Sequence, residues 1–207
     1  MAQTLSTTAQ NSLDETISVL KLGSLVAIPT DTVYGLSAKY DDRSAIRRLY
    51  DVKERPANKA IPILVGDASA LSEITSDFPP NARILAERFW PGALTLIVKR
   101  SHKVPSVAAP GTTVAVRMPA HQWLLSLLIL VGPLAVSSAN LSGQPPNLTG
   151  PSVAAALGKH IDLIIDGGQA QEGKPSTIVD CSVHPPVVLR DGPITAKQIH
   201  AAMDGAA

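Results

Sequence analysis

Residues 25–36 read LVAIPTDTVYGL, an apolar run of four residues followed by a proline and three polar residues. The apolar run is typical of a buried strand that ends at Pro29. Taken alone, the polar residues favour a turn, because the side chains of Thr30 and Asp31 bond readily to nearby backbone groups. Three adjacent polar groups at a strand end are also typical of a ligand crevice in an α/β sheet. Both interpretations stay open for Thr32.

The hydrophobic patterns on either side of this stretch predict one α/β domain. Helices are predicted at residues 12–22, 41–53, 80–89, 121–131, 152–159 and 195–203, with a further short helix capped by Asp67, and strands at 25–28, 60–65, 93–100, 113–119, 133–138, 162–166, 176–180 and 186–190. Helices and strands alternate early and strands cluster late, which predicts a single-domain, twisted, open mixed sheet flanked by helices. We expect this domain to span residues 13–203, after a flexible polar segment over residues 1–12.

The composition excludes several classes of protein. The 207 residues are 45% hydrophobic and 17% charged, which fits one folded domain. A net charge of +1 gives no whole-molecule case for binding nucleic acid or a membrane, although a local basic patch is compatible with it. The polar N-terminus lacks a secretory signal, and Cys181 is the single cysteine, so we expect a cytoplasmic protein. The five histidines lack metal-ligand spacing, and no metal site is predicted.

A second polar junction is KERPANKA at residues 53–60, which carries Lys53, Arg55 and Lys59. Compensation of the dipole at a helix C-terminus explains Lys53, and it contributes about 0.3–1 kcal/mol. It explains Arg55 and Lys59 poorly, because Pro56 has already ended the helix. Three cations around one loop suit a polyphosphate, since arginine can bind two phosphate oxygens at once.

Two further junctions carry polar residues at strand ends. Arg117 lies inside an apolar strand, and a buried lone cation requires either an acidic partner or an anionic ligand. On this fact alone the two explanations are equally good. The stretch AVSSANLSGQPPN at residues 135–147 has more hydroxyl and amide groups than helix capping can use.

Several familiar motifs are missing from the chain. It has no GxxxxGK[ST] phosphate loop, no GxGxxG dinucleotide fingerprint and no GxSxG nucleophile elbow. The residues therefore favour a site that binds and orients anions over one that uses a covalent nucleophile.

Seven short motifs, taken in their order, carry a resemblance to a known family. They are PTDTVYGL (29–36), KERP (53–56) with a later lysine, PGALT (91–95), VRMP (116–119), SSANLSG (137–143), PSTIVD (175–180) and LRDG (189–192). Each motif is weak by itself, but the ordered set closely resembles the YrdC-like family, the threonylcarbamoyl-AMP synthases, in a short, single-domain form. The match covers nearly the whole chain.

The resemblance implies a YrdC-like catalytic domain with a large, basic, concave cavity. It also implies an enzyme that joins L-threonine, bicarbonate or CO2, and ATP with Mg2+ to give threonylcarbamoyl-AMP and pyrophosphate. The product would supply the threonylcarbamoyl group that is placed on the adenosine next to the tRNA anticodon. The implied partners are the downstream tRNA threonylcarbamoyl-transferase machinery and tRNA itself, with no membrane.

The same resemblance implies a role for individual residues. The catalytic residues that meet the nucleotide phosphates would be Lys53, Arg55 and Lys59. ATP would also be bound by Thr113, the backbone of Ala139, Asn140, Asn147 and Arg190. L-threonine would be bound by Thr32, Tyr34, Arg117, Ser137, Ser176 and Thr177.

Two other functions compete with this interpretation. An RNA-binding module could use the same basic cavity, but the near-neutral charge and an aromatic content of 3% argue against it. A carbamoyl-adenylate domain of the hydrogenase maturation type would accompany acylphosphatase-like and zinc-finger regions. A chain of 207 residues with one cysteine has no room for them.

Overall fold

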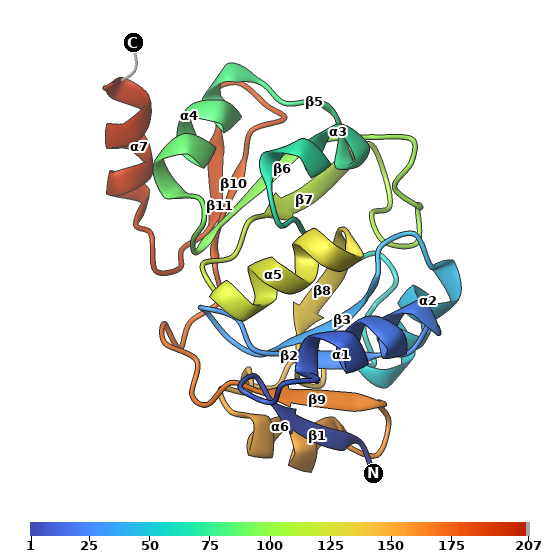
Figure 1. Ribbon diagram of the computed structural model, residues 1–207. Coiled ribbons are helices and arrows are strands. Elements are labelled where there is room, and N and C mark those ends of the chain that lie inside the picture. Colours follow the sequence, from blue (N-terminus) through green and yellow to red (C-terminus); the bar gives the residue numbers. More distant parts are fainter. Residues whose placement is uncertain (206–207) are drawn as a thin grey trace.

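The computed structural model describes residues 1–205 and contains one mixed, eleven-stranded sheet with helices on both faces (Figure 1). The strands are β1 (Gln3–Ser6), β2 (Val26–Ile28), β3 (Gly35–Lys39), β4 (Ile63–Leu64), β5 (Thr75–Asp77), β6 (Leu94–Arg100), β7 (Thr113–Arg117), β8 (Leu134–Ser138), β9 (Leu163–Asp166), β10 (Thr177–Asp180) and β11 (Val187–Arg190). The helices are α1 (Ser12–Lys21), α2 (Arg43–Val52), α3 (Leu71–Ile74), α4 (Pro80–Phe89), α5 (Gln122–Val131), α6 (Gly150–Leu157) and α7 (Ala196–Asp204), with a 3-10 turn η1 (Ala68–Ala70).

The sheet runs in the order β1-β9-β2-β3-β8-β4-β7-β6-β10-β11, and β5 pairs with β6. Parallel pairs such as β2–β9 and β4–β7 occur beside antiparallel pairs such as β3–β8 and β6–β7. The strands rotate progressively from β1 to β11, so the sheet is open and strongly twisted (Figure 1). The predicted fold class is confirmed.

Two hydrophobic cores cover the two faces of the sheet. Successive strand residues point to opposite faces, so in β2 the side chain of Ala27 joins one core while Val26 and Ile28 join the other. The larger core lies under α2, α4, α6 and α7, and the smaller one lies under α1 and α5. All three residues of β2 are fully buried, which confirms that the apolar run before Pro29 is a buried strand.

Every predicted helix and strand is present, but the strands β1, β3 and β5 were missed. The N-terminal segment was expected to be flexible, and this was wrong for residues 3–6, because β1 pairs in parallel with β9 from Gln3–Leu163 to Ser6–Asp166. Its side chains are mostly exposed, so the backbone bonds that hold it leave no hydrophobic signal. The strand β3 has the sequence GLSAK, whose small residues hide the usual alternation although four of the five are buried.

The strand order brings the polar junctions of the sequence together. The turn at residues 29–34 leads into β3, which pairs with β8, the strand that enters the 135–147 stretch. Next to β8 lies β4, which pairs with β7 and so places Arg117 nearby. Beyond β7, the strand β6 pairs with β10, which begins at Thr177. These junctions therefore meet on neighbouring strands in the middle of the sheet.

Gly192→Ala should destabilise the fold, because Gly192 packs directly on the backbone that enters β10. A Cβ atom on this residue would lie 2.6 Å from the carbonyl carbon of Ser176, far inside van der Waals contact. We expect the free energy of unfolding to fall by about 1–3 kcal/mol, the usual cost of overpacking. Urea unfolding measures the change.

The matched control is Gly205→Ala at the end of α7, where the nearest atom to the added carbon is 3.4 Å away. This control should keep the stability of the wild type. Equal unfolding midpoints for Gly192→Ala and the control would contradict the packing described for Gly192.

Candidate functional site

A cavity of about 290 Å³ opens where these strands meet. The predicted site residues that line it are Thr32, Tyr34, Arg55, Arg117, Ser137, Ser176 and Arg190. Its lining includes three arginines, and no aspartate or glutamate among residues 1–205 belongs to it. The volume is at the lower end for ligand pockets, which span about 300–1,000 Å³, so the large basic cavity expected from the sequence stays a prediction.

The turn that follows β2 forms one wall of the cavity. Thr30, Asp31 and Thr32 are all buried, with exposed fractions of 5%, 5% and 1%. The hydroxyl of Thr30 donates to the carbonyl of Val33 (2.7 Å) and accepts from the backbone N–H groups of Thr32 and Val33. The predicted turn chemistry is therefore present. It leaves Asp31 for another partner, while the hydroxyl of Thr32 lies 3.0 Å from that of Thr30.

Arg117 is buried, and its guanidinium is held on three sides. One Nη2–H donates to the carboxylate of Asp31 (2.6 Å), one Nη1–H to the hydroxyl of Thr32 (2.9 Å), and Nε–H to the carbonyl of Gly92 (2.9 Å). The acidic partner that the sequence left open is therefore Asp31. Burial lowers the pKa of Arg117, and the charge of Asp31 opposes this change. A guanidinium has five N–H groups, so two of them have no partner among residues 1–205.

Arg190 brings a second guanidinium to the cavity. Its Nε–H and Nη2–H donate to the carbonyl of Ser176 at 3.0 Å and 2.8 Å, and it has no ion-pair partner in the described part of the chain. Burial lowers the pKa of Arg190, and the positive charge of Arg117 lowers it further. Two cations that repel each other across a cavity favour a bound anion between them.

The three cations of the 53–60 loop have different environments. Arg55 lines the cavity, and its guanidinium donates to the carbonyls of Lys59 (3.1 Å) and Ala60 (2.7 Å). Lys53 is fully buried, and its ammonium donates to the carbonyls of Ser138 and Asn140. Burial, followed by the charge of Arg55, lowers the pKa of Lys53 to about 8.

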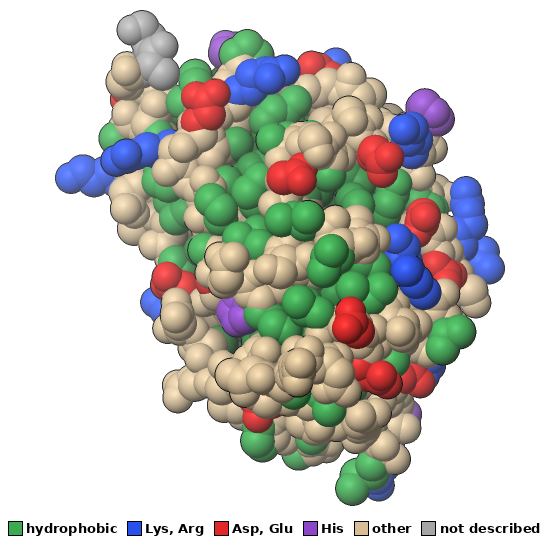
Figure 2. All heavy atoms as spheres, in the orientation of Figure 1, with side chains coloured by type: hydrophobic (Ala, Val, Ile, Leu, Met, Phe, Trp, Pro, Cys, Tyr) green, Lys and Arg blue, Asp and Glu red, His purple; other side chains and the backbone are tan. Residues whose placement is uncertain are grey.

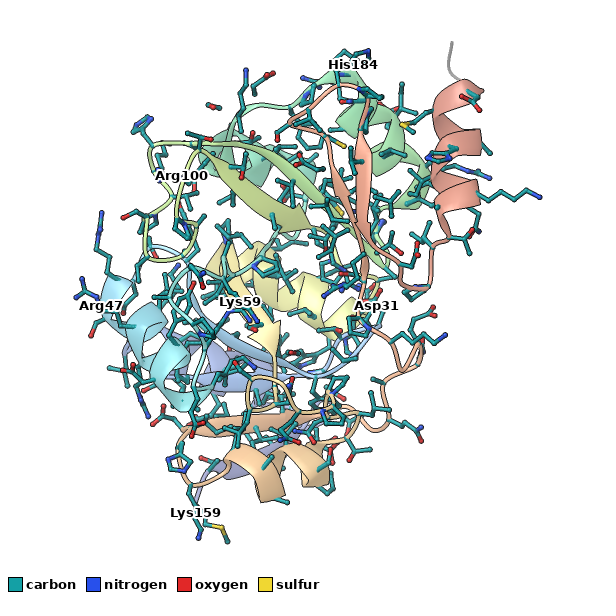
Figure 3. The ribbon with its side chains drawn as sticks, turned by 180° about the vertical axis from the view of Figure 1, so that it is seen from behind. Asp31, Arg47, Lys59, Arg100, Lys159 and His184 are labelled. Carbon is teal, nitrogen blue, oxygen red and sulfur yellow. The ribbon has the colours of Figure 1, made fainter. Side chains whose placement is uncertain are left out.

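Lys59 is an exposed residue, and its side chain lies near the middle of the molecule when viewed from behind (Figure 3). Asp31 also lies near the middle in this view, whereas Arg47, Arg100, Lys159 and His184 lie at the periphery (Figure 3). The structure thus places Arg55 in the cavity, Lys53 beneath the loop that follows β8, and Lys59 at the surface.

The loop after β8 is held by its own polar groups. Ala139 is fully buried; its N–H donates to the carbonyl of Tyr34 (2.7 Å), and its carbonyl accepts from the side chain of Asn147 (2.6 Å). The side-chain N–H groups of Asn140 donate to two carbonyls of the same loop. The buried Oδ1 of Asn140 and Oγ of Ser142 have no hydrogen-bond partner among residues 1–205.

Tyr34 closes the cavity from the β3 side. Its hydroxyl donates to the carbonyl of Gly168 (2.7 Å) or to the carboxylate of Asp166 (3.0 Å), and accepts from the N–H of Gly167. Burial is the main reason that the pKa of Tyr34 is raised to about 12. The phenol is therefore a fixed wall and stays protonated across the neutral range.

The predicted site residues that do not line the cavity are Lys53, Lys59, Thr113, Ala139, Asn140, Asn147 and Thr177. The hydroxyl of the fully buried Thr177 donates to the carbonyl of Ile194 (2.6 Å), so it fastens the segment after β11 to β10. Thr113 shares a face of β7 with Ala115, which lines the cavity, but it lies two positions earlier in the strand. There it lines a separate hollow together with Lys99 and Arg100. Neither Thr177 nor Thr113 is brought into the cavity, and their ligand contacts stay predictions.

Three lining or supporting residues were missed from the sequence. Thr95 lines the cavity and its hydroxyl bonds to that of Ser176 (2.8 Å); a polar residue inside an apolar strand was the signal for it. Thr30 and Asp31 stand beside Thr32 in the quoted stretch, but turn formation accounted for them.

The described residues show neither a metal cluster nor a membrane span. Within residues 1–205, no group of three or more His, Cys, Asp or Glu side chains could hold a metal ion. In the same residues, each helix is too short or too polar to cross a bilayer.

The chain matches a family of known proteins over most of its length. Residues 18–192 match the family model Sua5_yciO_yrdC, which is described as telomere recombination. This finding confirms the family that the ordered motifs predicted.

The curated relatives named threonylcarbamoyl-AMP synthase include proteins of Pyrococcus abyssi and Bacillus subtilis. The protein of Pyrococcus abyssi is 42% identical over 182 residues, which cover 87% of this chain and 54% of the relative. The protein of Bacillus subtilis is 41% identical over 189 residues, which cover 90% of this chain and 55% of the relative. The chain therefore spans about half the length of these curated relatives.

A solved structure shares the fold closely. The crystal structure of Pyrococcus abyssi Sua5 complexed with L-threonine superposes with a TM-score of 0.93 at 37% identity, covering 98% of this chain and 61% of that one. That protein binds L-threonine.

Lys53→Met should remove a pH dependence of stability. In the folded protein the pKa of Lys53 is lowered from 10.5 to about 8. Between these values the unfolded chain binds more protons at this position, so the free energy of unfolding rises with pH. From about pH 8 to 9 the rise should be about 1 kcal/mol in the wild type, and it should be absent in Lys53→Met.

Urea unfolding at several pH values in this interval measures the effect, with the exposed Lys59→Met as a control that keeps the wild-type slope. The interval ends near pH 9 because the pKa of the Cys181 thiol is raised from 9.0 to about 12, which lowers stability at higher pH. Parallel profiles for the wild type and Lys53→Met would contradict the buried position of Lys53.

Proposed function

The chain belongs to the Sua5/YciO/YrdC family, and from this membership and its cavity we propose that it is a threonylcarbamoyl-AMP synthase. The reaction joins L-threonine, bicarbonate or CO2, and ATP into threonylcarbamoyl-AMP, and it releases pyrophosphate. The observation that carries the proposal is the cavity itself: Arg117 and Arg190 face an acid-free space that is also lined by hydroxyl groups. Such a space suits a ligand with a carboxylate or a phosphate group.

L-threonine would occupy the part of the cavity next to the turn. The two unengaged N–H groups of Arg117 would hold its carboxylate, and Thr32, Tyr34, Ser137 and Ser176 would wall its side chain. A volume of about 290 Å³ is adequate for one amino acid. In this proposal Thr177 supports the pocket from behind through its bond to Ile194.

ATP would extend from this pocket past Arg55 and Arg190. These two side chains would meet the phosphates, and the exposed Lys59 would reach them from the surface. Asn140 would also contact the nucleotide, and its Oδ1 is buried without a hydrogen-bond partner among residues 1–205. The remaining proposed nucleotide contacts are Thr113, Ala139 and Asn147.

Mg2+ would enter with the nucleotide as part of the substrate. Because residues 1–205 offer no cluster of metal-binding side chains, the phosphates and water would provide its ligands. Lys53 would act indirectly in this scheme, because its ammonium fixes the carbonyls of Ser138 and Asn140 under the nucleotide.

The chemistry requires little covalent participation by the protein. The amine of threonine adds to CO2 and loses a proton, which gives a carbamate. A carbamate oxygen then attacks the α-phosphorus of ATP, and the bond to the pyrophosphate group breaks. Negative charge accumulates on the departing phosphates, so catalysis rests on positioning and on stabilisation by the cations.

The product would pass to a transferase that modifies tRNA, and the activity would then lie in the cytoplasm. Direct binding of tRNA is the less supported function. The face in Figure 2 carries Lys and Arg side chains interspersed with Asp and Glu, and it shows no continuous basic surface (Figure 2). This one face therefore offers no path for RNA phosphates, and the net charge of +1 gives no whole-molecule case for binding them.

Pyrophosphate release from ATP tests the proposed function. Purified protein with Mg2+ and bicarbonate should release pyrophosphate when L-threonine is present, and not when the amino acid is omitted. L-serine, which lacks the methyl group of threonine, should support a slower reaction. Absence of release under all these conditions would contradict the proposal, and RNA titration at two salt concentrations would then test the alternative.

Arg55→Ala should lower the rate of pyrophosphate release by about 10²–10³-fold, by analogy with the loss of one preorganised donor at a developing charge. The matched control is Arg47→Ala, which removes an exposed arginine of α2 at the periphery of the molecule (Figure 3). Arg47→Ala should keep the wild-type rate. Near-normal turnover by Arg55→Ala would remove Arg55 from the proposed phosphate site.

A further inference from the structure

Thr95 lies on the cavity wall between Arg117 and Arg190. The antiparallel register of β6 and β7, continued by one residue, places Thr95 opposite Arg117. On its other side Thr95 pairs with Ile178 of β10, and Ile178 pairs with Arg190 of β11. Cross-strand partners share a face of the sheet, and all four side chains line the cavity. Thr95 therefore stands inside a row of side chains that begins at one guanidinium and ends at the other.

The hydroxyl group of Thr95 is paired with that of Ser176, and the two oxygens lie 2.8 Å apart. Both residues are buried, with exposed fractions of 1% and 5%. The Ser176 oxygen also accepts from Nη2 of Arg190 (3.3 Å). The pair carries two protons, and only one of them can lie between the two oxygens. The other proton has no acceptor among residues 1–205, so the pair presents a hydrogen-bond donor to the cavity.

The nearest charged group adds further donors beside this pair. The bonds of Arg190 to Ser176 use its Nε–H and Nη2–H groups, so the two N–H groups on Nη1 have no acceptor among residues 1–205. Within the same residues no carboxylate lines the cavity, and the charge of Arg117 helps to lower the pKa of Arg190. Donors and positive charge without an acceptor at this place suit a small oxyanion.

The place of Thr95 in the row decides which oxyanion it suits. In the proposed function Arg117 holds the carboxylate of threonine, and Arg190 meets the phosphates of ATP. The carbon that becomes the carbamate must then lie between the amine of threonine and the α-phosphate. Thr95 and Ser176 lie between the same two arginines.

We propose that Thr95 and Ser176, together with Nη1 of Arg190, bind the carbon donor as the bicarbonate anion. A planar ion with three oxygens accepts from the hydroxyl pair and from the guanidinium at once, whereas neutral CO2 gains little from the positive charge. The inference rests on the proposed function. It gives Thr95 a binding role, which the resemblance did not imply.

Bicarbonate gives the same carbamate as CO2, and the step is balanced without a further reactant. The amine nitrogen of threonine attacks the bicarbonate carbon, and a C–N bond forms. The C–O bond to the hydroxyl group of bicarbonate breaks, and the departing hydroxide takes one proton from the amine and leaves as water. One negative charge is present before and after the step, on bicarbonate and then on the carbamate.

The first test identifies the form of the carbon donor. Pyrophosphate release is started either with dissolved CO2 or with bicarbonate, at one pH and at a low temperature where the two forms interconvert slowly. Bicarbonate should support the full rate at once, and CO2 should show a lag that added carbonic anhydrase removes. A full initial rate with CO2 and a lag with bicarbonate would overturn the inference.

The second test measures the KM values for bicarbonate, L-threonine and ATP in Thr95→Val, which keeps the shape of threonine and removes the hydroxyl. The KM for bicarbonate should rise by about tenfold or more, because a hydrogen bond to a charged group is lost. The other two KM values should stay near those of the wild type. Thr95→Ser, which keeps the hydroxyl, should restore most of the affinity for bicarbonate.

The matched control is Thr16→Val, which removes a fully buried hydroxyl in α1 that donates to the carbonyl of Ser12 (2.7 Å). It should keep the wild-type KM for bicarbonate. A purely structural role of Thr95 would raise all three KM values together or leave them all unchanged, and either result would overturn the inference.

Direct binding separates this inference from the proposed function. The ¹³C resonance of labelled bicarbonate should broaden when the wild-type protein is added, and less so with Thr95→Val. Broadening that depends on Thr95, without pyrophosphate release under any condition, would support the site and contradict the proposed function. Threonine-dependent release with an unchanged KM for bicarbonate in Thr95→Val would overturn the inference alone. The form of the carbon donor decides the question even if Thr95→Val fails to fold.

Discussion

The buried ion pair between Asp31 and Arg117 is the interaction on which the site depends. Nη2 of Arg117 and Oδ1 of Asp31 lie 2.6 Å apart, and both side chains are about 6% exposed. Burying two charges is costly, and it is tolerated only where additional hydrogen bonds complete the arrangement. Here Thr32 and Gly92 provide them. Removing one partner of such a pair typically costs about 3–5 kcal/mol, so the turn after β2 and the end of β7 are constrained together.

This pair also makes the cations of the cavity differ in their net charge. Because Asp31 neutralises Arg117, the uncompensated charge belongs to Arg190 and Arg55, which have no acidic partner within residues 1–205. Arg117 retains directional N–H groups, and Arg190 and Arg55 retain net charge. The first property suits the orientation of a small carboxylate, and the second suits phosphates on which charge accumulates. Lys53 holds the backbone after β8 through hydrogen bonds to its carbonyl groups.

The sequence predicted the fold well because its apolar runs and their periods are strong signals, as in β2 and α5. It missed β1 because an edge strand held by backbone bonds needs no hydrophobic pattern. The site residues were predicted mainly through the ordered motifs; the structure brings Arg55, Arg117 and Arg190 to one cavity, and their ligand contacts stay predictions. The sequence could not show that Lys53 points to backbone carbonyls. Its direction is set by a tertiary contact between the end of α2 and the loop after β8, and these segments are far apart in the sequence.

Asp31 was missed for the same reason, because its partner is also set by a tertiary contact. Its turn propensity explained its presence, so nothing in the pattern indicated a partner 86 residues away.

The most direct test of the account is a crystal structure with L-threonine bound. The account predicts that the carboxylate lies within hydrogen-bond distance of Arg117, with the Asp31–Arg117 pair unchanged. A carboxylate bound away from Arg117, or an Arg117 that has left Asp31, would contradict it.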